Sequence, residues 1–346
     1  MQGIHHRQML LAWIGEAGQA RLAQSHALVV GCGALGGVIV EWLARAGVGE
    51  LTLVDRDVVE ASNLHRQVLF TARDARERVP KAEAAARRVR EIAPGVRVHA
   101  CVEHLGPGNA MELARGAGVI VDGLDNIEGR LVLNDLAVRE RLPFVHAAAV
   151  AMQGRSLAVL PDGACLRCVF PEMPEPGALE TCDTAGVAGP VVGLAGSFAA
   201  LQAMRVLADR SDLLDRGLWC ADLDRNRMVS VAVRRDPACA CCGARRFPFL
   251  EQTADRTASL CGRGAVQVLP AAGARGTLSL ERLGERLGVH GRFDRQGDRL
   301  HGVLYSARNA DGVPYELTVF ADGRAIVGRC TDRDAALGVY DRFVGG

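Results

Sequence analysis

The first residues of this sequence that could do chemistry form a glycine turn. The stretch GCGALG, which contains Gly31, Gly33 and Gly36, follows an apolar run and leads into a helix-like segment. Glycines at such a turn allow backbone N–H groups to approach a phosphate at the positive end of a helix. Asp55 ends the next apolar run, where an acid can hold a ribose hydroxyl. The turn and the acid predict a nucleotide site, and they fit NAD and ATP alike.

A polar segment follows Asp55 and includes Asn63, Arg66 and Gln67. The adenosine end of NAD needs an acid and an apolar slot there, so an Arg and a Gln have little use in a dehydrogenase. A triphosphate does need such side chains. The alternative is a solvated loop with a helix N-cap at Ser62.

Lys81 is the single lysine among 41 basic residues. It follows Pro80 at the predicted start of a helix, so its ammonium can lean back toward the strand ends and the phosphates there. Asp125 stands just after another strand end, where a carboxylate can bind Mg²⁺. Asp125 could instead cap the next helix, and both roles can hold at once.

Cysteines give a second chemical signal. Cys165 with Cys168, and Cys239 with Cys242, form two CxxC pairs. Four thiolates at this spacing make a closed, tetrahedral zinc site. Cys241 is an extra thiol that could compete for the metal or face outward.

Cys182 stands apart from these pairs, between a proline-rich loop and a predicted helix at 191–207. An exposed thiol near a helix start can become a nucleophile, although Asp183 beside it works mildly against the thiolate. A loop thiol without a catalytic role is the alternative. We predict core positions for Cys32, Cys101 and Cys220 and assign no role to Cys261.

The elements that must position these residues alternate between strand and helix. After a helix at 10–24, this alternation predicts an α/β fold with a Rossmann-like, doubly wound, mostly parallel sheet, and ligands gather beyond the carboxyl ends of such strands. The strands are predicted at 27–31, 51–55, 96–102, 118–122 and 143–148, and the helices at 35–46, 80–92, 109–115 and 127–140.

The alternation stops after residue 155. Antiparallel strands are predicted at 156–160 and 228–233, appended to the parallel sheet. For the last part of the chain, the pattern predicts a separate small α+β domain of unknown role. Its helices are predicted at 279–287 and 334–343, and its strands at 299–306 and 315–326. A hairpin turn at 321–323 interrupts the second strand. We therefore divide the chain into a first domain at 1–250, with the cysteine pairs inside 165–242, and a second domain at 259–346.

Composition limits the classes of function. The chain has 346 residues, 49% of them hydrophobic, and a formal net charge of +1. Interspersed charges of both signs give no electrostatic footprint for nucleic acid or for an anionic membrane. No apolar segment reaches the length of a membrane span without Arg, Glu or several glycines, and the N-terminus lacks the layout of a signal peptide, so we expect a cytoplasmic protein.

The ordered set of motifs resembles the ThiF/MoeB/HesA adenylyltransferases, relatives of the ubiquitin-activating enzymes. The resemblance runs over about residues 7–245 and includes the opening Arg7-Gln8. Cys32 and Ala34 depart from the family's commoner Ala and Gly, and Ile4-His5-His6 replaces its usual upstream Arg and Tyr. None of these departures removes a group with a named role, and the resemblance favours ATP over NAD.

The resemblance implies a role for each motif residue. Arg7 would reach the site of the partner subunit in a homodimer, and Cys182 could take the acyl group as a thioester or an acyl disulfide. Catalysis would also depend on Arg7, Arg66, Lys81 and Asp125. Asp125 would in addition hold Mg²⁺, and the four paired cysteines would hold Zn²⁺. ATP would be bound by Gly31, Gly33, Gly36, Asp55, Asn63, Arg66, Gln67, Lys81, Asp125 and Asn126.

The implied reaction is attack by a carboxylate on the α-phosphate of ATP, which gives an acyl adenylate and pyrophosphate. The family's substrate is the C-terminal Gly-Gly of a ubiquitin-like sulfur carrier of the ThiS or MoaD type. Thiocarboxylate formation then serves thiamine, molybdopterin or tRNA thiolation pathways. No rhodanese signature is present, so sulfur would come from another protein, a cysteine desulfurase or a rhodanese.

The sequence leaves three other functions open. The enzyme could adenylate another acyl group or a tRNA, but the sequence lacks a basic surface. It could be an NAD-dependent oxidoreductase, which leaves Arg66, Lys81, Asp125 and the paired cysteines unexplained. It could also be a binding module without activity, against which these same residues argue.

Overall fold

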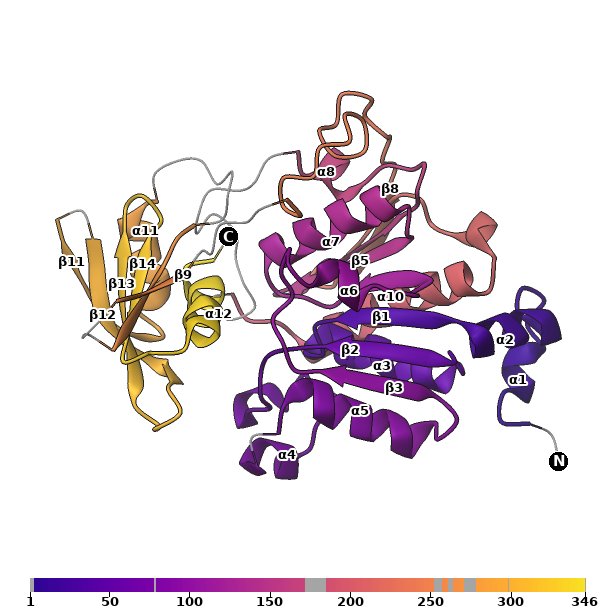
Figure 1. The fold of residues 1–346 in the computed structure, drawn as a ribbon, viewed down its shortest axis with the longest axis horizontal. Helices are drawn as coiled ribbons and strands as arrows, with labels where there is room; N and C mark the ends of the chain where they lie inside the picture. The colour runs from indigo at the N-terminus through magenta and orange to yellow at the C-terminus, as the bar shows by residue number, and fades with distance from the viewer. Residues whose placement is uncertain are drawn as a thin grey trace. The chain divides into compact units, whose positions relative to one another are not determined.

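The computed structural model describes residues 3–77, 79–171, 185–251, 257–260, 264–270, 278–297 and 299–345 (Figure 1). The chain divides into two compact units. The first comprises Met1–Asp125, Gly129–Pro171 and Val187–Glu251, and the second comprises Asn126–Glu128, Glu172–Gly186 and Gln252–Gly346. Two short segments of the first domain predicted from the sequence, at 126–128 and 172–186, thus belong to the second unit.

The first unit is built on a mixed sheet with the strand order β3-β2-β1-β4-β5-β6-β7-β8. Neighbouring strands from β3 to β5 run parallel, and β6, β7 and β8 continue the sheet in antiparallel pairs. This confirms the predicted Rossmann-like sheet with antiparallel strands appended. The strands are β1 (His26–Val30), β2 (Glu50–Val54), β3 (Arg97–Cys101), β4 (Val119–Asp122), β5 (Phe144–Val150), β6 (Gln153–Val159), β7 (Leu218–Asp222) and β8 (Arg227–Val231).

Helices connect the parallel strands and cover the sheet, as Figure 1 shows for α3, α5 and α7. The long helix α10 packs on α3 and against β5 and β6. It is long and apolar enough to cross a membrane by length and composition, and half of that window is buried by this packing. The helices are α3 (Ala34–Arg45), α4 (Ala72–Glu77), α5 (Lys81–Ile92), α6 (Ala110–Leu113), α7 (Ile127–Glu140), α8 (Leu166–Val169) and α10 (Gly189–Leu207), with 3₁₀ turns η1 (Ala61–Asn63) and η2 (Ser211–Leu213).

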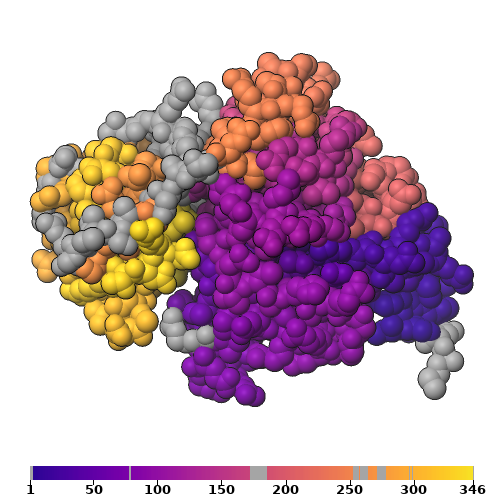
Figure 2. Space-filling view, viewed as in Figure 1, coloured from indigo at the N-terminus to yellow at the C-terminus, as the bar shows by residue number. Residues whose placement is uncertain are grey.

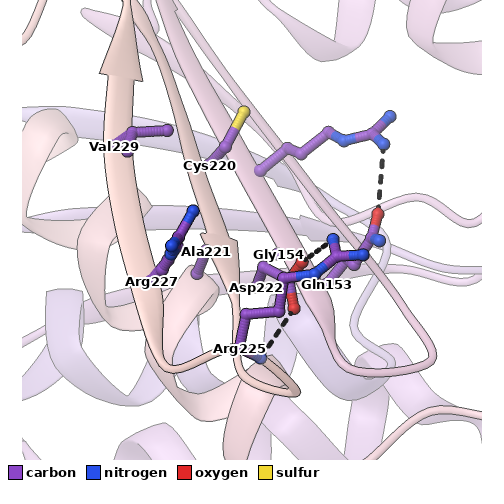
Figure 3. A pocket seen from close by; sticks show the side chains of 9 residues that line it. Gln153, Gly154, Cys220, Ala221, Asp222, Arg225, Arg227 and Val229 are labelled. Atoms are coloured by element: carbon purple, nitrogen blue, oxygen red, sulfur yellow. Dashed lines mark hydrogen bonds and ion pairs between the residues drawn. The ribbon is translucent and has the colours of Figure 1, made fainter.

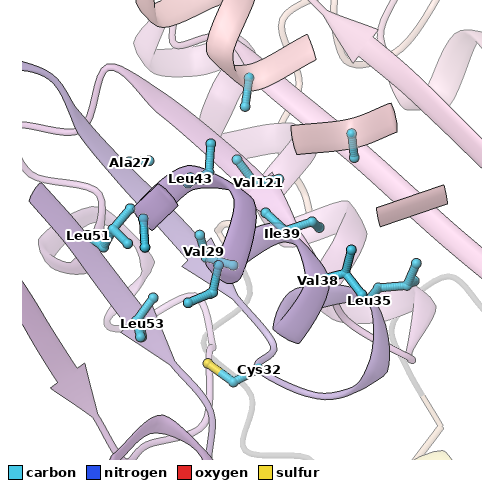
Figure 4. Packing of buried hydrophobic residues seen from close by; sticks show 14 of the residues in the cluster. Ala27, Val29, Cys32, Leu35, Val38, Ile39, Leu43, Leu51, Leu53 and Val121 are labelled. Carbon is cyan, nitrogen blue, oxygen red and sulfur yellow. The ribbon is translucent and has the colours of Figure 1, made fainter. Parts of the chain in front are cut away.

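The core of the first unit lies between the sheet and these helices. Val29 and Leu53 from neighbouring strands point toward the layer that holds Ile39 and Leu43 of α3 (Figure 4). Strands β1, β2 and β4 are nearly continuous apolar runs, because both faces of the parallel sheet are covered there. The core therefore fixes the carboxyl ends of β1, β2 and β4 relative to one another, and the predicted site residues follow those ends.

The predicted N-terminal helix at 10–24 is confirmed over its last 10 residues, which form α2 (Gly15–Gln24), but the helix begins later than predicted. Residues 10–14 form turns, and a separate short helix, α1 (His6–Met9), precedes them. Gly15 has a φ of +53°, which a continuous right-handed helix does not allow. The side chain of Gln8 donates to the carbonyl of Ala46 at 3.0 Å, so α1 packs on the body of the first unit (Figure 2, indigo).

The second unit is an α+β fold, as predicted, around an antiparallel sheet in the order β11-β12-β13-β14-β10-β9. The hairpin between β13 and β14 confirms the predicted turn, where Gly323 has a φ of +83°. Strands β7, β9, β10 and β11 were not foreseen, because they are short and periodicity over so few residues is a weak signal. The elements are β9 (Thr257–Leu260), β10 (Ala265–Val268), α11 (Leu280–Leu287), β11 (Gly291–Gln296), β12 (Arg299–Arg308), β13 (Pro314–Phe320), β14 (Ala325–Gly328) and α12 (Arg333–Phe343).

Candidate functional site

Three glycines meet at the carboxyl ends of β1 and β4. Gly31 has a φ of +85° and its N–H donates to the carbonyl of Val54. A Cβ on Gly36 would stand 1.7 Å from the carbonyl oxygen of Gly31, and one on Gly123 would stand 2.7 Å from the same oxygen. Side chains are therefore excluded at this contact. Gly33 is the N-cap of α3, so the turn presents the helix start that the sequence predicted.

Asp55 joins the glycine turn to the loop that follows β2. Its two carboxylate oxygens accept the N–H groups of Cys32 at 2.7 Å and of Asp57 at 2.8 Å. Burial raises the pKa of Asp55 from 3.8 to about 6, although Lys81 opposes this rise. Each oxygen has a further lone pair that can accept a hydroxyl, as a ribose contact requires.

Lys81 begins α5, as predicted, and is buried. Its N–H donates to the carbonyl of Asp57 at 2.8 Å, and its ammonium pairs with the Asp57 carboxylate at 2.9 Å. Burial lowers the pKa of Lys81, but the carboxylates of Asp57 and Asp55 outweigh burial and raise it above its ordinary value, with a smaller contribution from Asp125. A permanent cation thus lies among three acids beside the glycine turn.

The polar segment after Asp55 folds into the short turn η1 rather than a loop capped at Ser62. Glu60 is the N-cap, and it exchanges hydrogen bonds with Asn63 in a capping box. Asn63 and Gln67 are buried. The Gln67 amide lies against Gly33, and its buried Oε1 has no hydrogen-bond partner among the described residues. An unpaired buried oxygen beside the glycine turn fits a ligand that brings a donor.

Arg66 lies at the surface of this turn. Its guanidinium donates to the carbonyl of Ser62 at 3.0 Å. No carboxylate within ion-pairing distance of Arg66 occurs in the described part of the chain. Its charge is available to a phosphate.

The loop that carries Asp125 is fixed by a buried carboxylate, Asp122. This carboxylate accepts the N–H of Leu124 at 2.8 Å and the Nδ1–H of His146 at 2.6 Å, and it pairs with Arg130 Nε at 3.4 Å. Arg130 also donates to the carbonyl of Leu124. Burial lowers the pKa of His146, so the ring is neutral at neutral pH and the charge balancing Asp122 comes from Arg130. Asp125 is exposed, one residue beyond this clamp.

Arg7 lies away from these residues in its own chain. Helix α1 contacts Ala46, which precedes the amino end of β2, whereas Asp55 follows the carboxyl end of that strand. A five-residue strand is roughly 16 Å long, so the two ends are well separated. Arg7 is exposed. The fold therefore brings the glycines, Asp55, Lys81 and the Asp125 loop together and does not bring Arg7 to them.

The four paired cysteines form one cluster. Their sulfur atoms all lie within 4.8 Å of one another. Cys165 Sγ lies 3.7 Å from Cys239 Sγ, and Cys168 Sγ lies 3.4 Å from Cys242 Sγ. Sulfur atoms bound to a tetrahedral zinc ion at about 2.3 Å are about 3.8 Å apart, so the donor set and its size fit zinc. Hydrogen bonding, with Cys241 first, lowers the pKa of Cys165 and favours the thiolate that a metal binds.

The remaining cysteines differ in their surroundings. Cys241 is fully buried beside the cluster and so does not face outward. Cys32 is buried as predicted, whereas Cys101 and Cys220 are half-buried, so the core prediction is wrong for these two. Cys182 and Cys261 lie outside the described residues.

Several residues that shape the site were not singled out from the sequence. Asp57, Gly123, Arg130 and His146 are among them, and Asn134 beside the cysteines is another. The D-x-D pattern at 55–57 and the glycine between Asp122 and Asp125 were the available signals. His146 and Arg130 gave none, since their partners are distant in sequence.

A separate hollow of about 330 Å³ lies over the antiparallel part of the sheet. Figure 3 shows Asp222 paired with Arg225, and Arg227 and Val229 on the next strand. None of the predicted site residues lines it. The lining residues are Gln153, Gly154, Arg155, Cys220, Ala221, Asp222, Arg225, Arg227 and Val229.

Comparison with known proteins shows similarity to one family over most of the chain. Residues 5–241 match the pattern of the ThiF family. The chain is 37% identical over 350 residues to the sulfur carrier protein ThiS adenylyltransferase of Bacillus subtilis, with all of both chains covered. It is also 41% identical over 239 residues to the SAMP-activating enzyme E1 of Haloferax volcanii, which covers 69% of this chain and 88% of that protein.

Solved structures share the fold. The Escherichia coli MccB structure with MccA-N7isoASN matches with a TM-score of 0.63 and 21% sequence identity, over 70% of this chain and 75% of that one. At this identity the likeness supports the fold alone.

The buried pair of Asp122 and Arg130 gives a stability prediction. We expect Arg130→Leu to lower the free energy of unfolding by about 3–5 kcal/mol, because it leaves a buried carboxylate without a counter-charge. The same substitution should cost much less when Asp122→Asn is already present. Urea unfolding followed by tryptophan fluorescence measures this, since Trp13, Trp42 and Trp219 all belong to the first unit.

Arg139→Leu is the matched control on the same helix. Arg139 pairs with Glu140, and both side chains are partly exposed. Its loss should cost no more than about 1 kcal/mol. Equal effects of Arg130→Leu with and without Asp122→Asn would show that the clamp carries no charge coupling.

Proposed function

The chain belongs to the ThiF family, and from this membership we propose how its residues carry out the family's reaction. It is an adenylyltransferase that activates a ubiquitin-like sulfur carrier protein. The carboxylate at the C-terminal Gly-Gly of the carrier attacks the α-phosphate of ATP. An acyl adenylate forms and pyrophosphate leaves. A carboxylate is already ionised at neutral pH, so the reaction needs no general base.

The observation that carries the proposal is the group of Lys81, Asp57 and Asp55 beside the glycine turn. NAD-dependent oxidoreduction leaves this buried lysine unexplained, whereas phosphate transfer needs fixed positive charge where negative charge develops. Lys81 is held by Asp57, and a triphosphate can replace Asp57 as its partner. The half-exposed Asp57 can then return to water at little cost.

Each remaining side chain has a place in this scheme. The N–H groups of the glycine turn and Gln67 bind the nucleotide, Asp55 accepts the ribose hydroxyls, and Asn63 and Asn126 complete the nucleotide site. Arg66 binds the phosphates. The enzyme accelerates the reaction by positioning the two bound reactants and by stabilising the charge that develops in the transition state.

Asp125 is the proposed ligand of Mg²⁺. It is exposed, next to a loop held rigid by Asp122 and Arg130, and oxygen ligands on few carboxylates suit this ion. When bound, Mg²⁺ neutralises charge on the phosphates.

The cysteine cluster is the proposed zinc site, with Cys165, Cys168, Cys239 and Cys242 as ligands. All four coordination positions are filled by protein, so the metal serves the structure and not the reaction. It would tie the segment before α10 to the segment after β8.

We further propose that the enzyme is a homodimer and that Arg7 acts in the partner's site. The distance between α1 and the carboxyl ends of the strands in one chain supports this. Cys182 is the proposed acceptor of the activated acyl group, and sulfur comes from a separate donor, a cysteine desulfurase or a rhodanese. A cytoplasmic location stays a prediction.

A ThiS-type carrier is the proposed substrate. The similarity to the B. subtilis ThiS adenylyltransferase extends over the whole chain, including the second unit, whereas the similarity to the H. volcanii enzyme covers 69% of the chain. A thiazole-forming pathway that consumes the thiocarboxylate follows from this choice.

The first test is ATP–pyrophosphate exchange with and without a ThiS-type carrier that ends in Gly-Gly. We expect exchange that depends on the carrier and falls by about 10²–10³ in Lys81→Ala and Asp125→Ala, since each removes charge stabilisation of the reacting phosphates. Arg88→Ala, on the exposed side of α5, should keep wild-type exchange. Absence of exchange with ThiS-type and MoaD-type carriers alike would refute the proposal.

The raised pKa of Asp55 predicts a pH dependence. Below its pKa of about 6 the carboxyl is protonated and loses acceptor capacity, so the affinity for ATP should fall, approaching about tenfold per pH unit. Because the folded-state pKa is raised, the contribution of Asp55 to folding stability is larger at low pH and is lost as pH rises through 6, so acid does not unfold the protein through this group.

Calorimetric titration of ATP between pH 5 and 8 measures the effect. Asp55→Asn is the control, since the titration of ATP itself is common to both proteins. The variant should bind weakly at every pH and show a flatter profile. Parallel profiles for the two proteins would contradict the role of Asp55.

Mixed dimers test the role of Arg7. We expect Arg7→Ala and Lys81→Ala to be nearly inactive alone. In a dimer of one copy of each, one site keeps both its own Lys81 and the partner's Arg7. Random mixing should thus restore about a quarter of the sites. No recovery after co-expression and confirmed mixing would show that Arg7 does not act across the dimer.

A further inference from the structure

One buried amide contacts both cysteine pairs. Asn134, in α7, has no exposed surface. Its Oδ1 accepts the N–H of Leu166 at 2.8 Å, and Leu166 lies between Cys165 and Cys168. Its Nδ2 donates to the sulfur of Cys241 at 3.3 Å, and Cys241 lies between Cys239 and Cys242. A single side chain therefore joins the two turns that supply the four sulfur ligands.

The orientation of this amide is fixed by its partners. The N–H of Leu166 can only donate, so the oxygen of Asn134 must face it. The nitrogen then faces Cys241, whose sulfur is the acceptor. Because the site excludes water, neither contact can be replaced by solvent if the side chain is removed.

The neighbouring residue adds a second attachment. The carboxylate of Asp135 is buried and accepts the N–H of Phe249 at 3.1 Å, beyond the second cysteine pair. The second turn is also closed locally, since the N–H of Gly243 donates to the carbonyl of Cys239 at 3.0 Å. Helix α7 thus carries adjacent polar side chains that hold the segment around Cys239 and Cys242.

We infer that Asn134 is a positioning residue of the proposed zinc site: its amide holds the two CxxC turns in the arrangement that a tetrahedral metal requires, and Cys241 anchors that amide rather than acting as a fifth ligand. The inference rests on the zinc site proposed above. Mutation of groups that orient metal ligands in this way commonly lowers metal affinity 10- to 100-fold.

Zinc loss to an excess of a chromophoric chelator tests this inference on the full-length protein. We expect Asn134→Ala to release zinc about 10- to 100-fold faster than wild type. Cys241→Ala, which removes one of the two contacts, should release it several-fold faster, and Cys241→Ser should still hold one zinc per chain. A lower zinc content in Cys241→Ser would overturn the assignment of Cys241.

Gln202→Ala is the matched control. Gln202 is a buried amide in α10 of the same unit, and its side chain bonds to Asp215 and Arg205 rather than to any cysteine segment. Its loss should leave the zinc release rate unchanged. Equal acceleration in both variants would show a general loss of stability and refute the positioning role.

The outcomes separate this inference from the zinc assignment. Wild-type protein that binds no zinc would refute the zinc site itself. A wild type that holds zinc and an Asn134→Ala variant that releases it at the same rate would refute only the role of Asn134. If Asn134→Ala does not fold, Cys241→Ala carries the test, and an unchanged release rate in that variant refutes the inference.

Discussion

The arrangement of the site depends on the direct contact between the backbone segments at Gly31, Gly36 and Gly123. No Cβ fits at Gly36 or Gly123, because the carbonyl oxygen of Gly31 lies 1.7 or 2.7 Å from where it would stand. This contact brings the turn after β1 against the loop after β4. Asp55 accepts a hydrogen bond from Cys32 of the same turn and so holds the loop after β2 beside that turn. Three loops therefore share one small region, two of them through direct backbone contact and the third through the Asp55 carboxylate.

Electrostatics decides what this region can bind. Lys81 is buried among Asp55, Asp57 and Asp125, so the group has an excess of negative charge and a cation that cannot leave. In the proposed function, Mg²⁺ and the phosphates of ATP would enter as partners of opposite sign, while the buried clamp of Asp122 and Arg130 keeps its own charges balanced. The charge that moves on binding would then belong to the exposed Asp57 and Asp125, where water lowers the cost of rearrangement.

Sequence patterns predicted the parallel sheet and the loops at its carboxyl ends because these depend on local signals. Apolar runs, the glycine turn and Pro80 before Lys81 each act within a few residues. The partners of Asp122 could not be found in this way, since His146 and Arg130 meet it only when β4, β5 and α7 assemble. The helix predicted at 10–24 begins only at Gly15, because this residue takes a conformation that apolar periodicity does not report. The paired cysteines were predictable from spacing, whereas Asn134 between them was not.

Helix α7 connects the two proposed metal sites. Arg130 and Asn134 are four residues apart, so they lie on the same face of the helix, one turn from each other. Arg130 holds the carbonyl of Leu124 beside Asp125, and Asn134 holds the turns of both cysteine pairs. A rotation of the helix about its axis would break both sets of bonds together. The rigidity that the cysteine cluster gives to its own segments therefore extends, through one turn of helix, to the loop that presents Asp125.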